Sequence, residues 1–131
     1  MKIIIVGAGA VGSIVAERLS RGENDVTLIE ADEQVVGVAQ EHLDALVLQG
    51  NGATIPMLQS AGVEKAEMLI AVTDVDEINI LACLTAHRLG VPKKIARVRN
   101  EDYYAGDIPC FEEIDHLINP DREAVLALHE L

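Results

Sequence analysis

A glycine-rich loop near the start of the chain has residue types suited to binding phosphate. It reads Gly7-Ala8-Gly9-Ala10-Val11-Gly12 and has the G-x-G-x-x-G spacing. In such a loop the first glycine permits a tight turn, the second lets a pyrophosphate approach bare backbone, and the third lets a helix pack closely on a strand. Unpaired N–H groups and the helix dipole would attract the phosphate charge. The alternative is a glycine-rich turn that binds no ligand.

A carboxylate further along the chain strengthens the hypothesis of a dinucleotide site. Glu30 lies 18 residues after Gly12, close to the roughly 20 expected for an acid that binds ribose. A carboxylate accepts hydrogen bonds from ribose hydroxyls but repels a 2′-phosphate, and Ala31-Asp32-Glu33 supplies no cation to hold one. We therefore expect Glu30 and Ala31 to meet the cofactor, and NAD(H) to be preferred over NADP(H). Alternatively, Glu30 is only a solvated strand end, and Asp32 is interpreted as the N-cap of the next helix.

Strands and helices that position these residues alternate along the chain. Short apolar runs predict strands at residues 3–6, 26–29, 45–48, 68–72, 94–98 and 117–118. Apolar residues at helical spacing predict helices at 11–21, 33–42, 54–61, 75–89 and about 120–131. This alternation predicts an α/β fold of Rossmann type, in which a doubly wound parallel six-stranded sheet has helices on both faces.

Length and composition predict a single domain over residues 1–131. This is an ordinary domain size, and half of the residues are hydrophobic, so the chain can bury a sizeable core. Twenty-two acidic residues against ten basic ones give a net charge of −12, and few residues are aromatic. The composition therefore argues against a nucleic-acid partner.

Cysteine use and hydropathy indicate the cytoplasm. Cys83 and Cys110 have no metal-binding or redox spacing and are interpreted as reduced thiols. The apolar start of the chain is interrupted by three glycines and shows no cleavage site, which argues against a signal peptide. No apolar stretch approaches the roughly 18 residues of a membrane span, so we expect no direct membrane insertion.

Several motifs together resemble those of one family. They are the glycine loop, Gly50-Asn51-Gly52-Ala53-Thr54, Thr73-Asp74-Val75-Asp76-Glu77-Ile78-Asn79, Ile95-Ala96-Arg97-Val98 and Ile118-Asn119-Pro120. The chain resembles the N-terminal nucleotide-binding domain of the TrkA/Ktr family, also called the RCK N-terminal or KTN domain. The resemblance implies a six-stranded Rossmann-type fold that binds NAD(H) or adenine nucleotides and regulates potassium transport without redox chemistry. It also implies a homodimer or higher oligomer, held at the inner face of the membrane by an integral-membrane potassium transporter or channel.

The same resemblance places further residues near the ligand. Asn51, Gly52 and Ala53 are expected at its adenosine half; alternatively, residues 50–52 form a turn that needs unusual φ angles. Thr73 and Asp74 follow the fourth strand beside the point where the strand order reverses. They are expected at the second ribose or the nicotinamide.

Charged residues on this side also have a structural interpretation. Asp74 and Glu77 are close to a capping box, and Asp76 and Glu77 suit a helix N-terminus. Arg97 lies in an apolar strand, where a charge needs an acid or a phosphate as its partner. Two alternatives therefore remain for Arg97: an ion pair with Asp74 or Glu77, and a contact with the ligand.

The choice of ligand and the class of protein leave alternatives. Family members suited to ATP tend to have arginine in the glycine loop, where this chain has Ala10 and Val11, so ADP or ATP is less expected than NAD(H). The second interpretation is an NAD-dependent oxidoreductase domain or a fragment of a larger dehydrogenase, although no acid–base constellation is visible. An apolar row on the last helix, Ala124, Leu128 and Leu131, is expected at a dimer interface.

Overall fold

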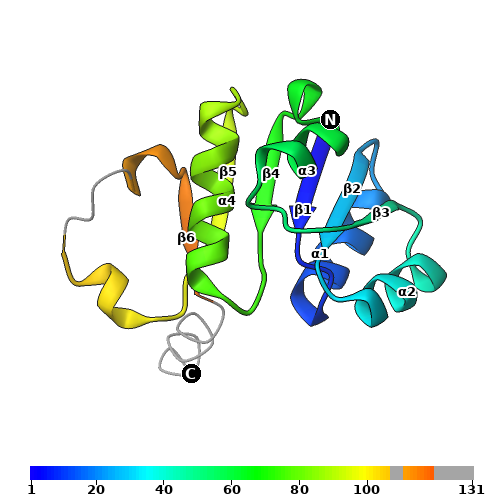
Figure 1. Ribbon diagram of the computed structural model, residues 1–131, viewed down its shortest axis with the longest axis horizontal. Helices are drawn as coiled ribbons and strands as arrows, with labels where there is room; N and C mark the ends of the chain where they lie inside the picture. The colour runs from blue at the N-terminus through cyan, green and yellow to red at the C-terminus, as the bar shows by residue number, and fades with distance from the viewer. Residues whose placement is uncertain (107–110, 120–131) are drawn as a thin grey trace.

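The computed structural model describes residues 1–106 and 111–119, which form a parallel sheet flanked by helices (Figure 1). The strands are β1 (Lys2–Val6), β2 (Asp25–Glu30), β3 (Leu46–Gln49), β4 (Met68–Ala71), β5 (Lys93–Arg97) and β6 (His116–Ile118). The α-helices are α1 (Ala10–Ser20), α2 (Glu33–His42), α3 (Ile55–Ser60) and α4 (Asp76–Arg88). The sheet order is β3-β2-β1-β4-β5-β6, and every neighbouring pair is parallel. This order confirms the predicted Rossmann-type fold.

The central strands are apolar on both sides because helices cover both faces of the sheet. In β1, Ile3, Ile4 and Ile5 are almost completely buried, as are Leu28 and Ile29 in β2. Runs of β-branched and aliphatic residues suit strands that are buried on both faces. Successive side chains alternate between the faces, so Ile4 belongs to one core and its two neighbours to the other.

Two hydrophobic cores lie on opposite faces of the sheet. One contains Ala16 of α1 together with Val36 of α2. The other contains Leu58 of α3 together with Ala82 of α4. Helices α1 and α2 therefore cover one face, and α3 and α4 cover the other, which confirms the prediction of helices on both faces. This arrangement leaves the carboxyl ends of β1 and β4 open at the edge of the sheet where the strand order reverses.

The start of α3 differs from a simple capped helix. Thr54 is the N-cap residue and Pro56 lies in the first turn. The Thr54 hydroxyl, however, donates to the carbonyl oxygen of Asn51 (2.9 Å) and makes no cap hydrogen bond. Thr54 therefore stabilises the preceding turn.

Within the described part of the chain, Asp74 and Glu77 do not form the capping box expected at the start of α4. The N-cap is Val75, and no side chain caps the helix. Asp76 accepts hydrogen bonds from two backbone N–H groups, of Arg99 (3.0 Å) and Asn100 (2.8 Å). Glu77 accepts one from the hydroxyl of Tyr103 (2.5 Å), which raises the pKa of that tyrosine. These acids therefore fasten the segment after β5 to the first turn of α4. That segment includes a 3₁₀ turn, Glu101–Tyr104.

A buried lysine joins β5 to β6. Lys94 is 4% exposed, and its Nζ donates to the carbonyl oxygen of Val91 (3.0 Å) and lies 3.5 Å from the Asp115 carboxylate. Asp115 also accepts a hydrogen bond from the backbone N–H of Lys94 (2.7 Å), and this bond holds the pKa of the carboxyl below its usual value. Burial raises the pKa of the neighbouring Cys83 thiol to about 12, so this thiol is protonated and unreactive at neutral pH.

Some expectations concern residues that the structure does not describe. Cys110 and the predicted last helix at about 120–131, with Ala124, Leu128 and Leu131, lie outside the described residues. Within the described ranges, no helix is both long and apolar enough to cross a membrane.

Candidate functional site

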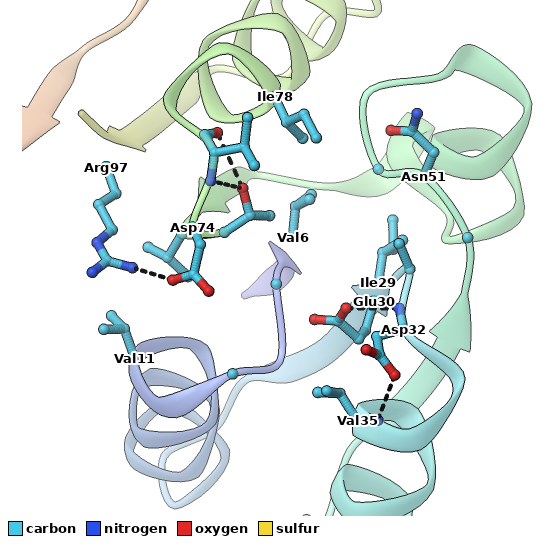
Figure 2. Close-up of a pocket in the computed structure, with 18 of the residues that line it drawn as sticks. Val6, Val11, Ile29, Glu30, Asp32, Val35, Asn51, Asp74, Ile78 and Arg97 are labelled. Atoms are coloured by element: carbon cyan, nitrogen blue, oxygen red, sulfur yellow. Dashed lines mark hydrogen bonds and ion pairs between the residues drawn. The ribbon is translucent and has the colours of Figure 1, made fainter. Parts of the chain in front are cut away.

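A cavity of about 510 Å³ opens between the carboxyl ends of β1 and β4 (Figure 2). Eleven predicted site residues line it: Gly7, Gly9, Ala10, Val11, Glu30, Ala31, Asn51, Gly52, Thr73, Asp74 and Arg97. Three others do not line it: Ala8, Gly12 and Ala53. The cavity lies where the strand order reverses, which is the usual ligand position in an open α/β sheet.

The three glycines of the loop have different surroundings. Gly7 has φ +106°, a conformation that L side chains rarely adopt, and a Cβ there would lie 3.0 Å from the backbone nitrogen of Thr73. A Cβ on Gly12 would lie 1.8 Å from the carbonyl oxygen of Gly7. A Cβ on Gly9 would meet nothing within 4 Å. The fold therefore requires glycine at positions 7 and 12, whereas Gly9 leaves open space at the N-terminus of α1.

The N-terminus of α1 faces this open space. The N-cap is Gly9, which has no side chain that could accept hydrogen bonds from the first N–H groups of the helix. The next two residues, Ala10 and Val11, line the cavity. Because the first N–H groups of a helix have no partner within the helix, this end presents donors and a partial positive charge to the cavity.

Glu30 is held in place by the backbone. Its Oε1 accepts a hydrogen bond from the Ala8 N–H (2.8 Å), and its Oε2 accepts one from the Asp32 N–H (2.9 Å). Ala8 is therefore a residue that orients Glu30 and is not itself part of the cavity wall. An ionised carboxylate has about four acceptor positions, so about two are left for ribose hydroxyls.

Asp32 has the predicted capping role. Its carboxylate accepts hydrogen bonds from the N–H groups of Gln34 (2.9 Å) and Val35 (3.4 Å) at the start of α2. It also lines the cavity beside Glu30, which the sequence interpretation did not include. Two carboxylates thus flank this side of the cavity, where a 2′-phosphate would be repelled.

The turn after β3 is built around Asn51. Its Oδ1 accepts a hydrogen bond from the Ala53 N–H (2.9 Å), so the acceptor end of the amide is already used. Ala53 is buried behind the turn. The alternative of unusual φ angles at residues 50–52 is wrong, because neither glycine there has a positive φ. Gly52 is instead required by space, since a Cβ there would lie 2.5 Å from a methyl carbon of Val6.

The opposite wall contains Asp74 and Arg97, which extend toward one another in Figure 2. The Arg97 Nη1 lies 3.4 Å from the Asp74 Oδ1, so of the alternatives left open for Arg97 the ion pair with Asp74 is present, and a contact with a ligand stays a prediction. The Arg97 side chain is only 11% exposed, whereas that of Asp74 is 92% exposed. Among the described residues, the Arg97 Nε is buried without a hydrogen-bond partner. Such an atom is expensive to leave unpaired, so this wall has unused capacity for an acceptor.

Asn79 is a residue whose role the sequence interpretation missed. It is completely buried on α4, and its side-chain amide joins Thr73 to the end of β5. The available signal was its spacing: Asn79, Cys83 and Ala86 occupy one helix face at i, i+4 and i+7, and the other two are buried. A polar amide in such a row must have buried partners.

Together, these features would suit a ligand with a central anionic group and a polar group at each end. The anionic group would meet the α1 N-terminus above Gly9, a ribose would meet Glu30, and the far end would lie between Thr73 and Arg97. Within residues 1–106 and 111–119, no cluster of His, Cys, Asp and Glu could hold a metal ion.

Comparisons of the sequence with known proteins agree with the predicted resemblance. The family model of the TrkA-N domain matches residues 3–120. A Trk system potassium uptake protein TrkA from Halomonas elongata is 44% identical over 126 residues, which make up 93% of this chain and 28% of that protein. The chain thus spans less than a third of the length of this relative.

Solved structures share the fold. The TrkA-N domain of the inner membrane protein ybaL from Escherichia coli has a TM-score of 0.84 at 24% identity, covering 98% of this chain and 94% of that chain. A GsuK channel bound to NAD has a TM-score of 0.77 at 26% identity, covering 99% of this chain and 23% of that chain. GsuK bound to ADP has a TM-score of 0.76 at the same identity, covering 99% and 33%.

Proposed function

This chain belongs to the TrkA-N domain family, and we propose that it is a regulatory NAD(H)-binding domain of a potassium transport system. In this proposal, nucleotide occupancy is coupled to the conformation of an integral-membrane transporter or channel. The chain acts as a homodimer or higher oligomer on the cytoplasmic side of the membrane, through its partner and without inserting. The similarity to the potassium uptake protein of Halomonas elongata supports the link to potassium transport.

The observation that carries the proposal is the fixed carboxylate of Glu30 beside the open space at Gly9. Two backbone N–H groups orient the carboxylate, so it needs no rearrangement to accept hydrogen bonds from a ribose. The hydrogen bond from the Ala8 N–H places this carboxylate against the glycine loop, two residues before the start of α1. A nucleotide with its ribose at Glu30 would therefore place its phosphates above Gly9.

The residues present also fit the second half of a dinucleotide. Arg97 offers the unpaired Nε, and Asp74 offers an exposed carboxylate that could accept from a second ribose. On the adenosine side, Asn51 has its Oδ1 engaged, so its Nδ2 is the atom expected to meet a base edge. NAD(H) uses both walls, whereas ADP would use only the side of Glu30 and the glycine loop. The structural similarity to a GsuK channel bound to NAD is consistent with this choice.

The composition of the cavity supports regulation over catalysis. Its described lining residues include two aspartates, one glutamate and one arginine, but no histidine, lysine, cysteine or tyrosine. A dehydrogenase needs a group placed to move a proton to or from its substrate, and the three carboxylates here already bind backbone N–H groups or pair with Arg97. We therefore favour a sensor, whose output is a shift between conformations. A ligand with a tenfold preference for one conformation would bias that equilibrium by about 1.4 kcal/mol.

Binding can be tested with calorimetry and thermal shifts on the chain with NAD⁺, NADH, NADP⁺, ATP, ADP and AMP. The proposal expects NAD⁺ or NADH to bind more tightly than NADP⁺ and ATP. A ligand present at 100 times its Kd should stabilise the protein by about 2.7 kcal/mol. Equal affinity for NADP⁺ would contradict the role of Glu30, and no binding of any nucleotide would contradict the proposed function.

The regulatory part needs a different measurement. Hydrogen exchange on the protein with NAD⁺, NADH and ADP should show ligand-dependent protection in residues 73–79. Identical profiles with all three saturating ligands would argue against sensing by this chain. Oxidation of NADH with turnover on a small carbonyl substrate would instead favour the oxidoreductase alternative.

A further inference from the structure

The side-chain amide of Asn79 is fully used in hydrogen bonds. Its Oδ1 accepts from the Thr73 N–H (2.9 Å) and from the Thr73 hydroxyl (2.7 Å). Its Nδ2 donates to the carbonyl oxygens of Thr73 (3.0 Å) and Arg97 (2.8 Å). An amide has two acceptor and two donor positions, and all four are filled here. Because Asn79 is completely buried, these bonds are shielded from water.

These bonds join the two strand ends that carry the Asp74 wall of the cavity. Thr73 follows β4, and Arg97 ends β5. The distance between them is therefore set by a side chain that does not itself line the cavity. The ion pair between Asp74 and Arg97 joins the same two strand ends closer to the solvent.

The opposite wall is held by a separate set of bonds. Glu30 is fixed by the backbone of Ala8 and Asp32, and Asn51 is fixed by its own turn. None of these three bonds involves Asn79 or Thr73. Figure 2 shows the two walls on opposite sides of the glycine loop, with Asp74 and Arg97 on one side and Glu30 and Asn51 on the other.

From this separation we propose that Asn79 is a positioning residue for the far half of a dinucleotide. It acts through Thr73 and Arg97 and selects ligands that extend beyond the pyrophosphate over mononucleotides, which lack the far half. This inference rests on the proposed function, because it assumes that NAD(H) occupies the cavity. It assigns the preference for a dinucleotide over a mononucleotide to a buried residue of α4.

The test compares NADH, which reaches both walls, with AMP, which reaches only the wall of Glu30. Calorimetry would give the ratio of the two affinities for the wild-type chain, Asn79→Ala and Asn79→Asp. The aspartate variant keeps the shape and the acceptors but loses the amide donors to Thr73 and Arg97. We expect the affinity for NADH to fall by about tenfold or more, the effect of losing one well-placed hydrogen bond to a charged group, with that for AMP nearly unchanged.

Cys83→Ala is the matched control. Cys83 is also completely buried on α4, one turn after Asn79, and its Sγ faces the Ile95 carbonyl oxygen (3.5 Å) away from the cavity lining. A general loosening between α4 and β5 would change the NADH-to-AMP ratio in this variant as well. An equal change in Cys83→Ala, or an unchanged ratio in both Asn79 variants, would overturn the inference.

A measurement on the wild-type chain covers the case in which the Asn79 variants do not fold. The Thr73 N–H, bonded to Asn79, should exchange more slowly with saturating NADH than with saturating AMP. Equal protection by the two ligands would overturn the inference. A wild-type chain that binds neither ligand would instead contradict the proposed function, so the two failures are distinguishable.

Discussion

Replacement of Gly9 by alanine tests whether the open space at this residue is needed for folding or for binding a ligand. A Cβ at Gly9 meets nothing within 4 Å, and the residue has φ −73° and ψ −157°, which alanine adopts without strain. In contrast, a Cβ at Gly12 would lie 1.8 Å from a backbone oxygen. The two substitutions add the same methyl group to the same loop but should have opposite consequences.

The magnitude for stability follows from two opposing terms at Gly9. Loss of glycine's freedom in the unfolded chain stabilises by about 0.4–1 kcal/mol, whereas alanine is a poorer N-cap residue by a similar amount. We therefore expect the free energy of unfolding of Gly9→Ala to change by less than about 1 kcal/mol. Gly12→Ala must displace Gly7 or α1, and overpacking of this kind costs about 1–3 kcal/mol or more.

The magnitude for binding follows from the phosphate contacts. The new methyl group would keep a pyrophosphate from the N–H groups at the start of α1. Each hydrogen bond to a charged group contributes about 1.5–3 kcal/mol, so losing one lowers the affinity by roughly tenfold to a hundredfold or more.

The assay combines thermal unfolding with calorimetry of NADH binding. Gly37→Ala is the control, because Gly37 in α2 also has open space around a new Cβ and does not line the cavity. We expect Gly37→Ala to bind NADH normally and Gly9→Ala to fold normally but bind poorly. Wild-type affinity in a folded Gly9→Ala protein would refute a pyrophosphate at Gly9. A loss of stability as large as that of Gly12→Ala would refute the inference that the space is open.

Three further predictions concern other parts of the structure. Glu30→Ala should narrow the preference for NADH over NADPH, measured as the ratio of dissociation constants, and an unaltered ratio would leave Glu30 without that role. Arg97→Met should weaken NADH binding by roughly tenfold to a hundredfold through loss of a charge-assisted contact while sparing AMP; equal losses for both ligands would contradict this. Asp115→Asn should lower Tm at pH 7, because the amide removes the negative charge that pairs with the Lys94 ammonium and strengthens the hydrogen bond from the Lys94 backbone N–H. This bond lowers the pKa of Asp115, so the ionised carboxylate stabilises the fold above its unfolded pKa of about 3.9. The difference in Tm between the wild-type protein and Asp115→Asn should therefore shrink as the pH falls below that value. A constant difference from pH 7 to pH 3 would exclude this cause.

Periodicity made the fold predictable. Most strands contain a short aliphatic run, and the helices carry apolar residues at helical spacing. Each end of the described strands and α-helices therefore differs from its prediction by at most one residue. The helix predicted at 33–42 is observed as Glu33–His42. The capping box at α4 was the main local error. Its acids bond to a segment more than 20 residues away, and local patterns do not contain that information.

The site was predictable where a residue's role depends on its neighbours in sequence. The glycine loop and Glu30 follow known spacings, and Glu30 and four of the six loop residues line one cavity in the structure. The separate roles of Ala8 and Asn79 depend on hydrogen bonds across 22 and 18 residues, to Glu30 and Arg97 respectively. The sequence also does not show how much room there is around each glycine. Only the structure shows that a Cβ on Gly52 would clash with Val6, whereas a Cβ on Gly9 would have no atom within 4 Å.

The double anchoring of Glu30 has a consequence for how coenzyme preference could evolve. A change to a neutral or basic residue at this position, the first step toward accepting a 2′-phosphate, would also leave the N–H groups of Ala8 and Asp32 without their acceptor. A protein with only this first substitution would be less stable for reasons unrelated to the coenzyme, because the glycine loop and the start of α2 would lose the carboxylate to which both donate. Lineages with this arrangement should therefore switch coenzyme only after a second substitution supplies a new acceptor. An ordered pair of mutations, with the acceptor introduced first, is the route that directed evolution should recover.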